Sequence, residues 1–227
     1  MKTNQELKNS ALAALKGNWA PAVLGAIFFT FATCLITSPG YCANMAAFDM
    51  PFFNSINPKL LKLFSNSSFL LNFFLLYPLS LGYSVAHKEL LQNGDAAITR
   101  NTVRLAFSDY VRNAVSILLV YLYTILWTLL FIVPGIIKGL AYSLTPFIVK
   151  DNPQLSPNQA INLSMKMMKG HKFDFFWLML SFLGWIFLAI LTLGIGLFWI
   201  TPYMYTAYAA FYRDVEAEYE TRINSIN

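Results

Sequence analysis

The stretch FFWLMLSFLGWIFLAILTLGIGLFWITPYMYTAYAAFY, residues 175–212, runs for 38 residues without one charged side chain. As a single straight helix it would measure about 57 Å, roughly twice the hydrocarbon core of a bilayer. The stretch therefore has to fold back on itself, and the glycines of Gly194-Ile195-Gly196 mark the place where a turn fits. This pattern predicts an integral membrane protein built from helical hairpins.

The composition of the whole chain agrees with a membrane setting. Of its 227 residues, 57% are hydrophobic and 12% are charged, whereas soluble domains carry about 25% charged residues. So few charges cannot cover a surface that faces water. The net charge of +5 comes from basic residues that flank apolar runs, a distribution typical of membrane topology and not of nucleic-acid binding. We expect one membrane domain over residues 1–227.

Six apolar runs are long enough to be read as membrane spans. They are Trp19–Ile36, Phe69–Ala86, Asn113–Val133, Gly135–Val149, Phe175–Leu193 and Leu197–Tyr212. The turn dipeptide Pro134-Gly135 separates the third span from the fourth. With both termini in the cytoplasm, the cytoplasmic segments hold 13 of the 16 Lys and Arg residues, as the positive-inside rule requires. We also expect Trp19–Ile36 to be an uncleaved anchor, because it exceeds the usual length of a signal-peptide core.

A repeat is visible in the order of these segments. A stretch with helical amphipathic spacing precedes each hairpin, over about Glu6–Lys16, Thr102–Arg112 and Pro157–Lys169. The third begins with a capping box, in which Ser156 is the N-cap and Gln159 closes the box. The repeat units are about residues 6–86, 98–149 and 157–212, and the first holds an extracytoplasmic insertion at 37–68. The sequence thus predicts an all-α, polytopic bundle of six transmembrane helices, arranged as three hairpins, each preceded by a cytoplasmic amphipathic helix.

Residues that carry chemistry are scarce. The only histidines, His87 and His171, stand beside predicted span ends with a lysine next to each, and we interpret them as interfacial anchors. The sequence contains neither an HExxH motif nor a CxxC pair. No Asp, Glu or His falls inside a predicted span, and an intramembrane enzyme would need such groups. We therefore expect no catalytic residues, no metal site, no cofactor and no enzymatic activity.

A few polar side chains within the spans are candidates for contact with a lipid or a substrate. Lys138 is the only charged residue inside a span, and its long stem would let it reach the outer headgroups. Tyrosines crowd the last span, where their hydroxyls either bind a lipid or polar substrate or form hydrogen bonds between helices. The candidate lipid- or substrate-facing residues are Lys138, Tyr142, Ser181, Tyr203, Tyr205, Thr206 and Tyr208.

Several ordered blocks resemble a known family. They include Val133-Pro134-Gly135-Ile136-Ile137-Lys138, Asp151-Asn152-Pro153, Met168-Lys169-Gly170-His171 and Leu193-Gly194-Ile195-Gly196, with Leu15-Lys16-Gly17-Asn18-Trp19 near the start. These blocks are similar to those of the bacterial membrane family called domain of unknown function 975. The resemblance implies a multi-span protein of the bacterial plasma membrane. It supplies no activity, substrate or catalytic residue.

Two functions remain open at this point. The first is a non-enzymatic scaffold that interacts with membrane lipids or a protein partner, with its basic amphipathic helices attracting anionic headgroups at the cytoplasmic leaflet. The alternative is a transporter or channel-like protein for a lipid or small amphiphile. That alternative predicts a cavity that reaches the middle of the membrane and is lined by residues such as Tyr142, Tyr203, Ser181 or Thr206.

Overall fold

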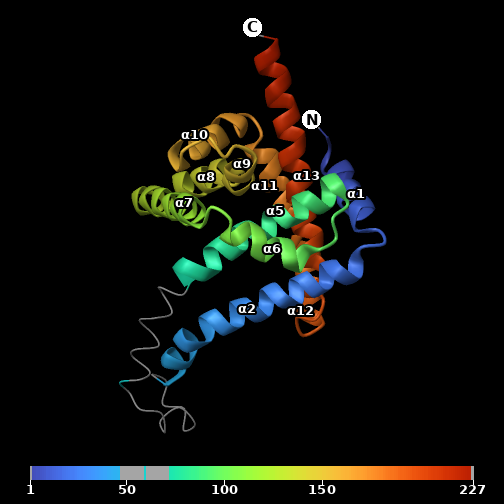
Figure 1. Cartoon of the computed structure of the whole chain (residues 1–227), viewed down its shortest axis with the longest axis vertical. Helices are drawn as coiled ribbons and strands as arrows, with labels where there is room; N and C mark the ends of the chain where they lie inside the picture. Colours follow the sequence, from blue (N-terminus) through green and yellow to red (C-terminus); the bar gives the residue numbers. More distant parts are fainter. Residues whose placement is uncertain (1, 47–58, 60–71, 226–227) are drawn as a thin grey trace.

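The computed structural model describes residues 2–46, 59 and 72–225, and each element in this part of the chain is helical. The elements are α1 (Asn4–Leu15), α2 (Trp19–Ala46), the π-helical turn η1 (Asn72–Leu76), α5 (Tyr77–Asn93), α6 (Ile98–Phe107), α7 (Tyr110–Leu130), α8 (Ile132–Tyr142), α9 (Thr145–Asp151), α10 (Pro157–Met167), α11 (Lys172–Leu180), α12 (Leu183–Leu191) and α13 (Leu197–Asn224). Figure 1 shows their arrangement. The predicted all-α fold class is confirmed.

Four stretches in the described part of the chain are helical, long and apolar enough to cross a membrane. They are Trp19–Thr37, Tyr110–Leu130, Ile132–Asp151 and Lys172–Leu191. They coincide with the first, third, fourth and fifth predicted spans. The second predicted span begins among residues outside the described part and continues as η1 and α5, and the sixth is the first half of α13.

The extracytoplasmic insertion predicted at 37–68 differs from the structure at its beginning. Helix α2 does not end at Ile36 but continues to Ala46, so the first residues of the expected loop are helical. Residues 47–58 and 60–68 of the insertion lie outside the described residues.

The turn between the third and fourth predicted spans lies earlier than Pro134-Gly135. Phe131 has extended backbone angles, and α8 starts at Ile132 with Pro134 in its first turn, a place where the missing proline N–H is tolerated. A Cβ added to Gly135 would lie 2.2 Å from Thr128 Oγ1. Gly135 is therefore a contact point that lets α8 approach α7 closely.

Helix α6 also differs from its prediction. It covers Ile98–Phe107 instead of Thr102–Arg112, because Asp109 adopts a left-handed conformation (φ 51°) and α7 begins directly after it. Its inward face carries Ile98, Asn101, Thr102 and Ala106, while Val103 and Phe107 are exposed. Part of the apolar surface of this amphipathic helix thus points away from the protein.

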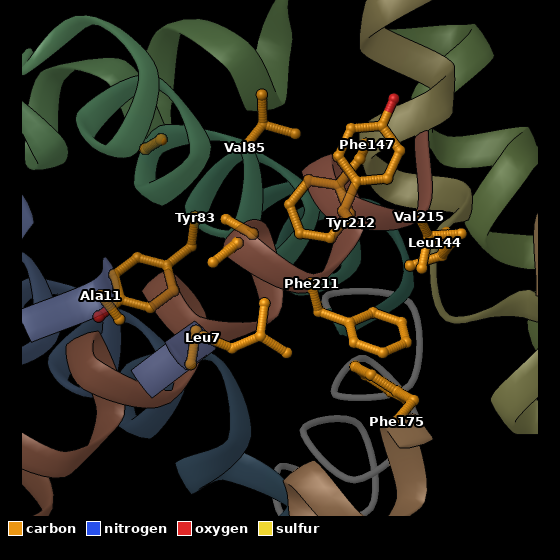
Figure 2. Packing of buried hydrophobic residues seen from close by; sticks show 14 of the residues in the cluster. Leu7, Ala11, Tyr83, Val85, Leu144, Phe147, Phe175, Phe211, Tyr212 and Val215 are labelled. Atoms are coloured by element: carbon orange, nitrogen blue, oxygen red, sulfur yellow. The ribbon is translucent and has the colours of Figure 1, made fainter. Parts of the chain in front are cut away.

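The core lies around the middle of α13. Figure 2 shows Phe211 and Tyr212 of α13 among side chains from α1, α5, α9 and α11. The Tyr212 ring stacks on Phe147 of α9 at 4.9 Å between centroids, and Phe211 lies 4.9 Å from Phe175 of α11. Buried aromatic side chains of α13 therefore contact α9 and α11, and the same core contains residues of α1.

The long helices do not all run in one direction. In Figure 1, α13 follows the long axis of the molecule, whereas α7 and α8 lie across it. The same view shows α1 beside α13, whose carboxyl end projects beyond it. The backbone N–H of Lys2 accordingly donates a hydrogen bond to Asp214 Oδ2 at 2.6 Å.

Candidate functional site

An ionic cluster joins three helices around the buried side chains of Lys88 and Tyr212. We define the acid–tyrosine cluster as Lys88 of α5, Asp151 of α9, and Tyr212 and Glu216 of α13. Lys88 is 5% exposed and forms an ion pair with Asp151. The Tyr212 hydroxyl lies 2.6 Å from Asp151 Oδ2 and 2.6 Å from Glu216 Oε1. An enclosed ammonium group requires such partners, because burying an unpaired charge is costly.

Three members of the cluster lie at or just after the ends of the three predicted repeat units. Lys88 and Asp151 each follow a unit by two residues, and Tyr212 is the last residue of the third unit. The ends of the three units therefore meet at this cluster. Sequence reasoning missed this cluster, since Lys88 and Asp151 are 63 residues apart and no local pattern links them.

The two histidines have different surroundings. His87 is fully buried, with its ring 4.4 Å from Tyr83 and its Nδ1 2.9 Å from the Tyr83 carbonyl oxygen. The interfacial position that the sequence predicted for His87 is therefore wrong. His171 is 9% exposed, and its Nε2 lies 3.2 Å from Glu218 Oε1 of α13. In the described part of the chain, no three His, Cys, Asp or Glu side chains come close enough to hold a metal ion.

The candidate tyrosines of α13 have ring contacts with neighbouring helices. Tyr203 lies edge to face with Phe182 at 5.1 Å, and Tyr208 lies 5.3 Å from Phe175. Tyr205 lies 4.8 Å from the ring of Tyr83 in α5. These contacts favour packing between helices for the three tyrosines, and a lipid-facing role for them stays a prediction.

The candidate hydroxyl residues Thr206 and Ser181 form local hydrogen bonds. Thr206 is fully buried, and its hydroxyl donates to the Pro202 carbonyl at 2.7 Å. The Ser181 hydroxyl donates to the Leu178 carbonyl at 2.6 Å. Each hydroxyl is thus satisfied within its own stretch of helix.

Lys138 and Tyr142 lie apart from these residues, on α8. The Lys138 ammonium is 4.7 Å from the centroid of the Trp127 ring and 3.8 Å from Met165 Sδ of α10. The Lys138 ammonium thus contacts α10, the helix that the sequence predicts to be cytoplasmic, and a position of Lys138 at the outer headgroups stays a prediction. Helix α10 folds back along α8, where the Ser164 hydroxyl donates to the Ala141 carbonyl at 2.8 Å.

Two adjoining grooves surround this part of α8. The basic groove, of about 510 Å³, is lined by Lys138, Asn162, Met165, Lys166, Lys169 and Lys172. The apolar groove, of about 590 Å³, is lined by Val133, Ile136, Ile137, Leu140, Phe173 and Phe176. Lys172 lines both grooves. The three-residue spacing of Lys166, Lys169 and Lys172 is visible in the sequence, but their proximity to Lys138 is not.

Comparison with known proteins gives a family match over part of the chain. Residues 113–219 match the model of the family described as "Protein of unknown function (DUF975)". The resemblance predicted from the sequence is therefore confirmed over this region, which contains both grooves and three of the four members of the acid–tyrosine cluster. The block at Leu15–Trp19 lies outside the match. Neither the curated proteins nor the solved structures contain a match to this chain.

Proposed function

We propose that the protein is a non-enzymatic, six-span protein of the bacterial plasma membrane, with both termini in the cytoplasm, that serves as a scaffold for lipids and a protein partner. One observation carries the proposal: large apolar side chains are exposed along the membrane-length helices. Leu129 is 78% exposed, Ile132 is 71% exposed and Phe187 is 66% exposed. Extended apolar surface of this kind is characteristic of contact with lipid or with another protein.

The interior favours a scaffold over a translocation pathway. Rings of α5, α9 and α11 fill the space around α13. Thr206, expected to line a transport cavity, is fully buried and bonded to Pro202, and Tyr203 is covered by Phe182. Side chains that a translocated molecule would need to contact are thus engaged with the protein itself.

The six-span topology draws support from the termini and from the charges. Crossing the membrane an even number of times returns the chain to the side on which it began, and the Lys2–Asp214 hydrogen bond joins the segment before the first proposed span to the residues just after the last one. The short helices α1, α6 and α10 lie in the basic segments that precede the first, third and fifth proposed spans.

Labelling of single cysteines tests the topology. In a background where Cys34 and Cys42 are replaced by Ala, Gln154→Cys and Ser67→Cys place a thiol on opposite sides of the proposed membrane. A membrane-impermeant maleimide should label Ser67→Cys in intact cells and Gln154→Cys only after lysis. The reverse pattern would overturn the orientation, and equal labelling of both before lysis would overturn the crossing.

Purification and flux measurements test the scaffold role. Copurification from native membranes with mild detergent should recover phospholipid and a protein partner at constant stoichiometry. Liposomes that contain the protein should show no faster movement of a short-chain fluorescent phospholipid than empty liposomes. Faster movement would favour the transport alternative and would count against the scaffold.

A further inference from the structure

We propose that the basic groove and the apolar groove form one binding site for an anionic phospholipid. The phosphate would lie on the lysines, and one acyl chain would follow the apolar groove along α8 and α11. The inference rests on the proposed function, because such a lipid reaches the site from the bilayer.

The lysines of the basic groove have no acidic partner among the residues that the structure describes. Lys166 and Lys169 are exposed, Lys138 and Lys172 are half-buried, and none of the four forms an ion pair with a residue that the structure describes. By contrast, Arg104 lies 3.1 Å from Glu89. The nearby carboxylate of Asp174 lies 3.5 Å from His171 Nδ1. An anion placed in the groove would therefore find positive charge that is not already neutralised.

Three separate segments bring these lysines together. Lys138 comes from α8, Lys166 from α10, and Lys169 and Lys172 from the turn that leads into α11. Gly170 in this turn has a φ of +99°, a conformation that a side chain would strain. The Ser164–Ala141 hydrogen bond holds α10 against α8, so the groove is fixed by the fold.

The apolar groove supplies the complementary half of an amphiphile site. Ile136, Ile137 and Phe173 remain well exposed on its walls, and its polar neighbour Lys172 also lines the basic groove. Each groove has a volume within the range of about 300–1,000 Å³ that is usual for small-molecule sites. Inorganic phosphate would use the basic groove alone, and an uncharged lipid would use the apolar groove alone. The shared border therefore favours a ligand with a charged head and an apolar tail.

Binding of defined lipids to the purified full chain tests the site. Native mass spectrometry in a neutral detergent would compare phosphatidylglycerol with phosphatidylcholine of the same acyl chains. Wild type should bind phosphatidylglycerol more tightly. Lys166→Gln/Lys169→Gln/Lys172→Gln should weaken phosphatidylglycerol binding at least about tenfold, since each nearby basic residue is worth about fivefold. The charge-preserving variant Lys166→Arg/Lys169→Arg/Lys172→Arg should retain binding.

A second triple variant separates the groove from general charge attraction. Lys2→Gln/Lys16→Gln/Arg100→Gln removes the same charge at exposed positions elsewhere in the protein, and it should bind phosphatidylglycerol within about twofold of wild type. An equal loss in both triples, or unchanged binding in the groove triple, would overturn the site. If the glutamine triple elutes as aggregate, Lys169→Gln decides alone, and wild-type affinity in that variant would overturn the site.

The acyl-chain half has its own matched pair of variants. Ile136→Gln/Phe173→Gln should weaken phosphatidylglycerol binding, whereas Ile190→Gln/Phe187→Gln, which changes similarly exposed residues of α12, should leave it unchanged. Competition by soluble glycerol phosphate at the affinity of the lipid would overturn the lipid as ligand in favour of a free phosphate. The cysteine labelling described above tests the six-span topology without any lipid-binding measurement. The topology and the phospholipid site can therefore fail separately.

Discussion

Lys88 and Asp151 form the ion pair whose loss should be most costly. Replacing Asp151 by Leu leaves a nearly buried ammonium without its carboxylate, and we expect Asp151→Leu to lower the free energy of unfolding by about 3 kcal/mol. The double variant Lys88→Met/Asp151→Leu should recover most of this loss, because neither charge remains. Thermal unfolding in detergent measures both. Arg104→Met, which breaks an exposed pair with Glu89, is the control and should cost less than about 1 kcal/mol. An equal loss in Asp151→Leu and the double variant would contradict this account.

At this scale the sequence predicts which residues are unusual better than it predicts where they lie. Lys138 stands out as the only charge in a predicted span, and it does line a groove. Its contact with Met165 depends on how α10 folds back, however, and the hydrogen bond from Ser164 to Ala141 that fixes this is not local in sequence. The burial of His87 was not predictable for a similar reason, because one of the two rings beside it, Tyr205, belongs to the distant helix α13.

Gly82 controls the contact between α5 and α6. A Cβ at this position would lie 2.2 Å from the Thr102 carbonyl oxygen and 2.8 Å from the Ala106 nitrogen. Both are backbone atoms, so the helices would have to separate. We expect Gly82→Ala to lower the free energy of unfolding by about 1–3 kcal/mol. Gly184→Ala is the matched control, since nothing lies within 4 Å of its added Cβ, and it should be neutral or slightly stabilising. Equal melting temperatures for the two variants would refute the close approach.

The stability that Asp95 gives to the start of α6 should be lost in acid. Asp95 accepts hydrogen bonds from Asn101 Nδ2 at 2.8 Å and from the Ala97 N–H at 3.0 Å, and these bonds hold the pKa of Asp95 below its usual value. A lowered pKa in the folded state contributes stability above the unfolded value of about 3.9, and this stability is lost as pH falls through the folded pKa. The melting temperature of wild type should therefore fall below about pH 4 more steeply than that of Asp95→Asn. Parallel pH profiles would show that these bonds contribute nothing.

Element boundaries could be predicted where local hydrogen bonds set them. The capping box at the start of α10 is present as predicted, with Ser156 N donating to Gln159 Oε1 at 2.8 Å and Gln159 N donating to Ser156 Oγ at 3.4 Å. The end of α6 could not be predicted, because it depends on the left-handed backbone of Asp109, a residue type that tolerates this conformation without requiring it. Its inward face was also unpredictable, since the close approach at Gly82 buries Asn101 and Thr102 instead of Val103.

Lipid should stabilise the molecule as a whole if the two grooves form one site. A ligand that binds only the folded state raises its stability by about 2.7 kcal/mol at a hundredfold excess over Kd. We expect phosphatidylglycerol in detergent to raise the melting temperature of wild type in a concentration-dependent way. Phosphatidylcholine should not do so, nor should phosphatidylglycerol with Lys166→Gln/Lys169→Gln/Lys172→Gln. A rise of the same size with both lipids would point to unspecific solvation of the apolar surface.

The acid–tyrosine cluster can be completed only after the last helix, α13, has been synthesised. A ribosome releases Lys88 first, Asp151 next and Tyr212 last, so the ammonium and the carboxylate exist for a time without the hydroxyl that joins them to α13. Until α13 emerges, the earlier helices lack the partner around which their aromatic rings gather. The newborn chain thus completes its core only when α13 is made, and a chain truncated before α13 would lack the helix that α1, α5, α9 and α11 share as a packing partner.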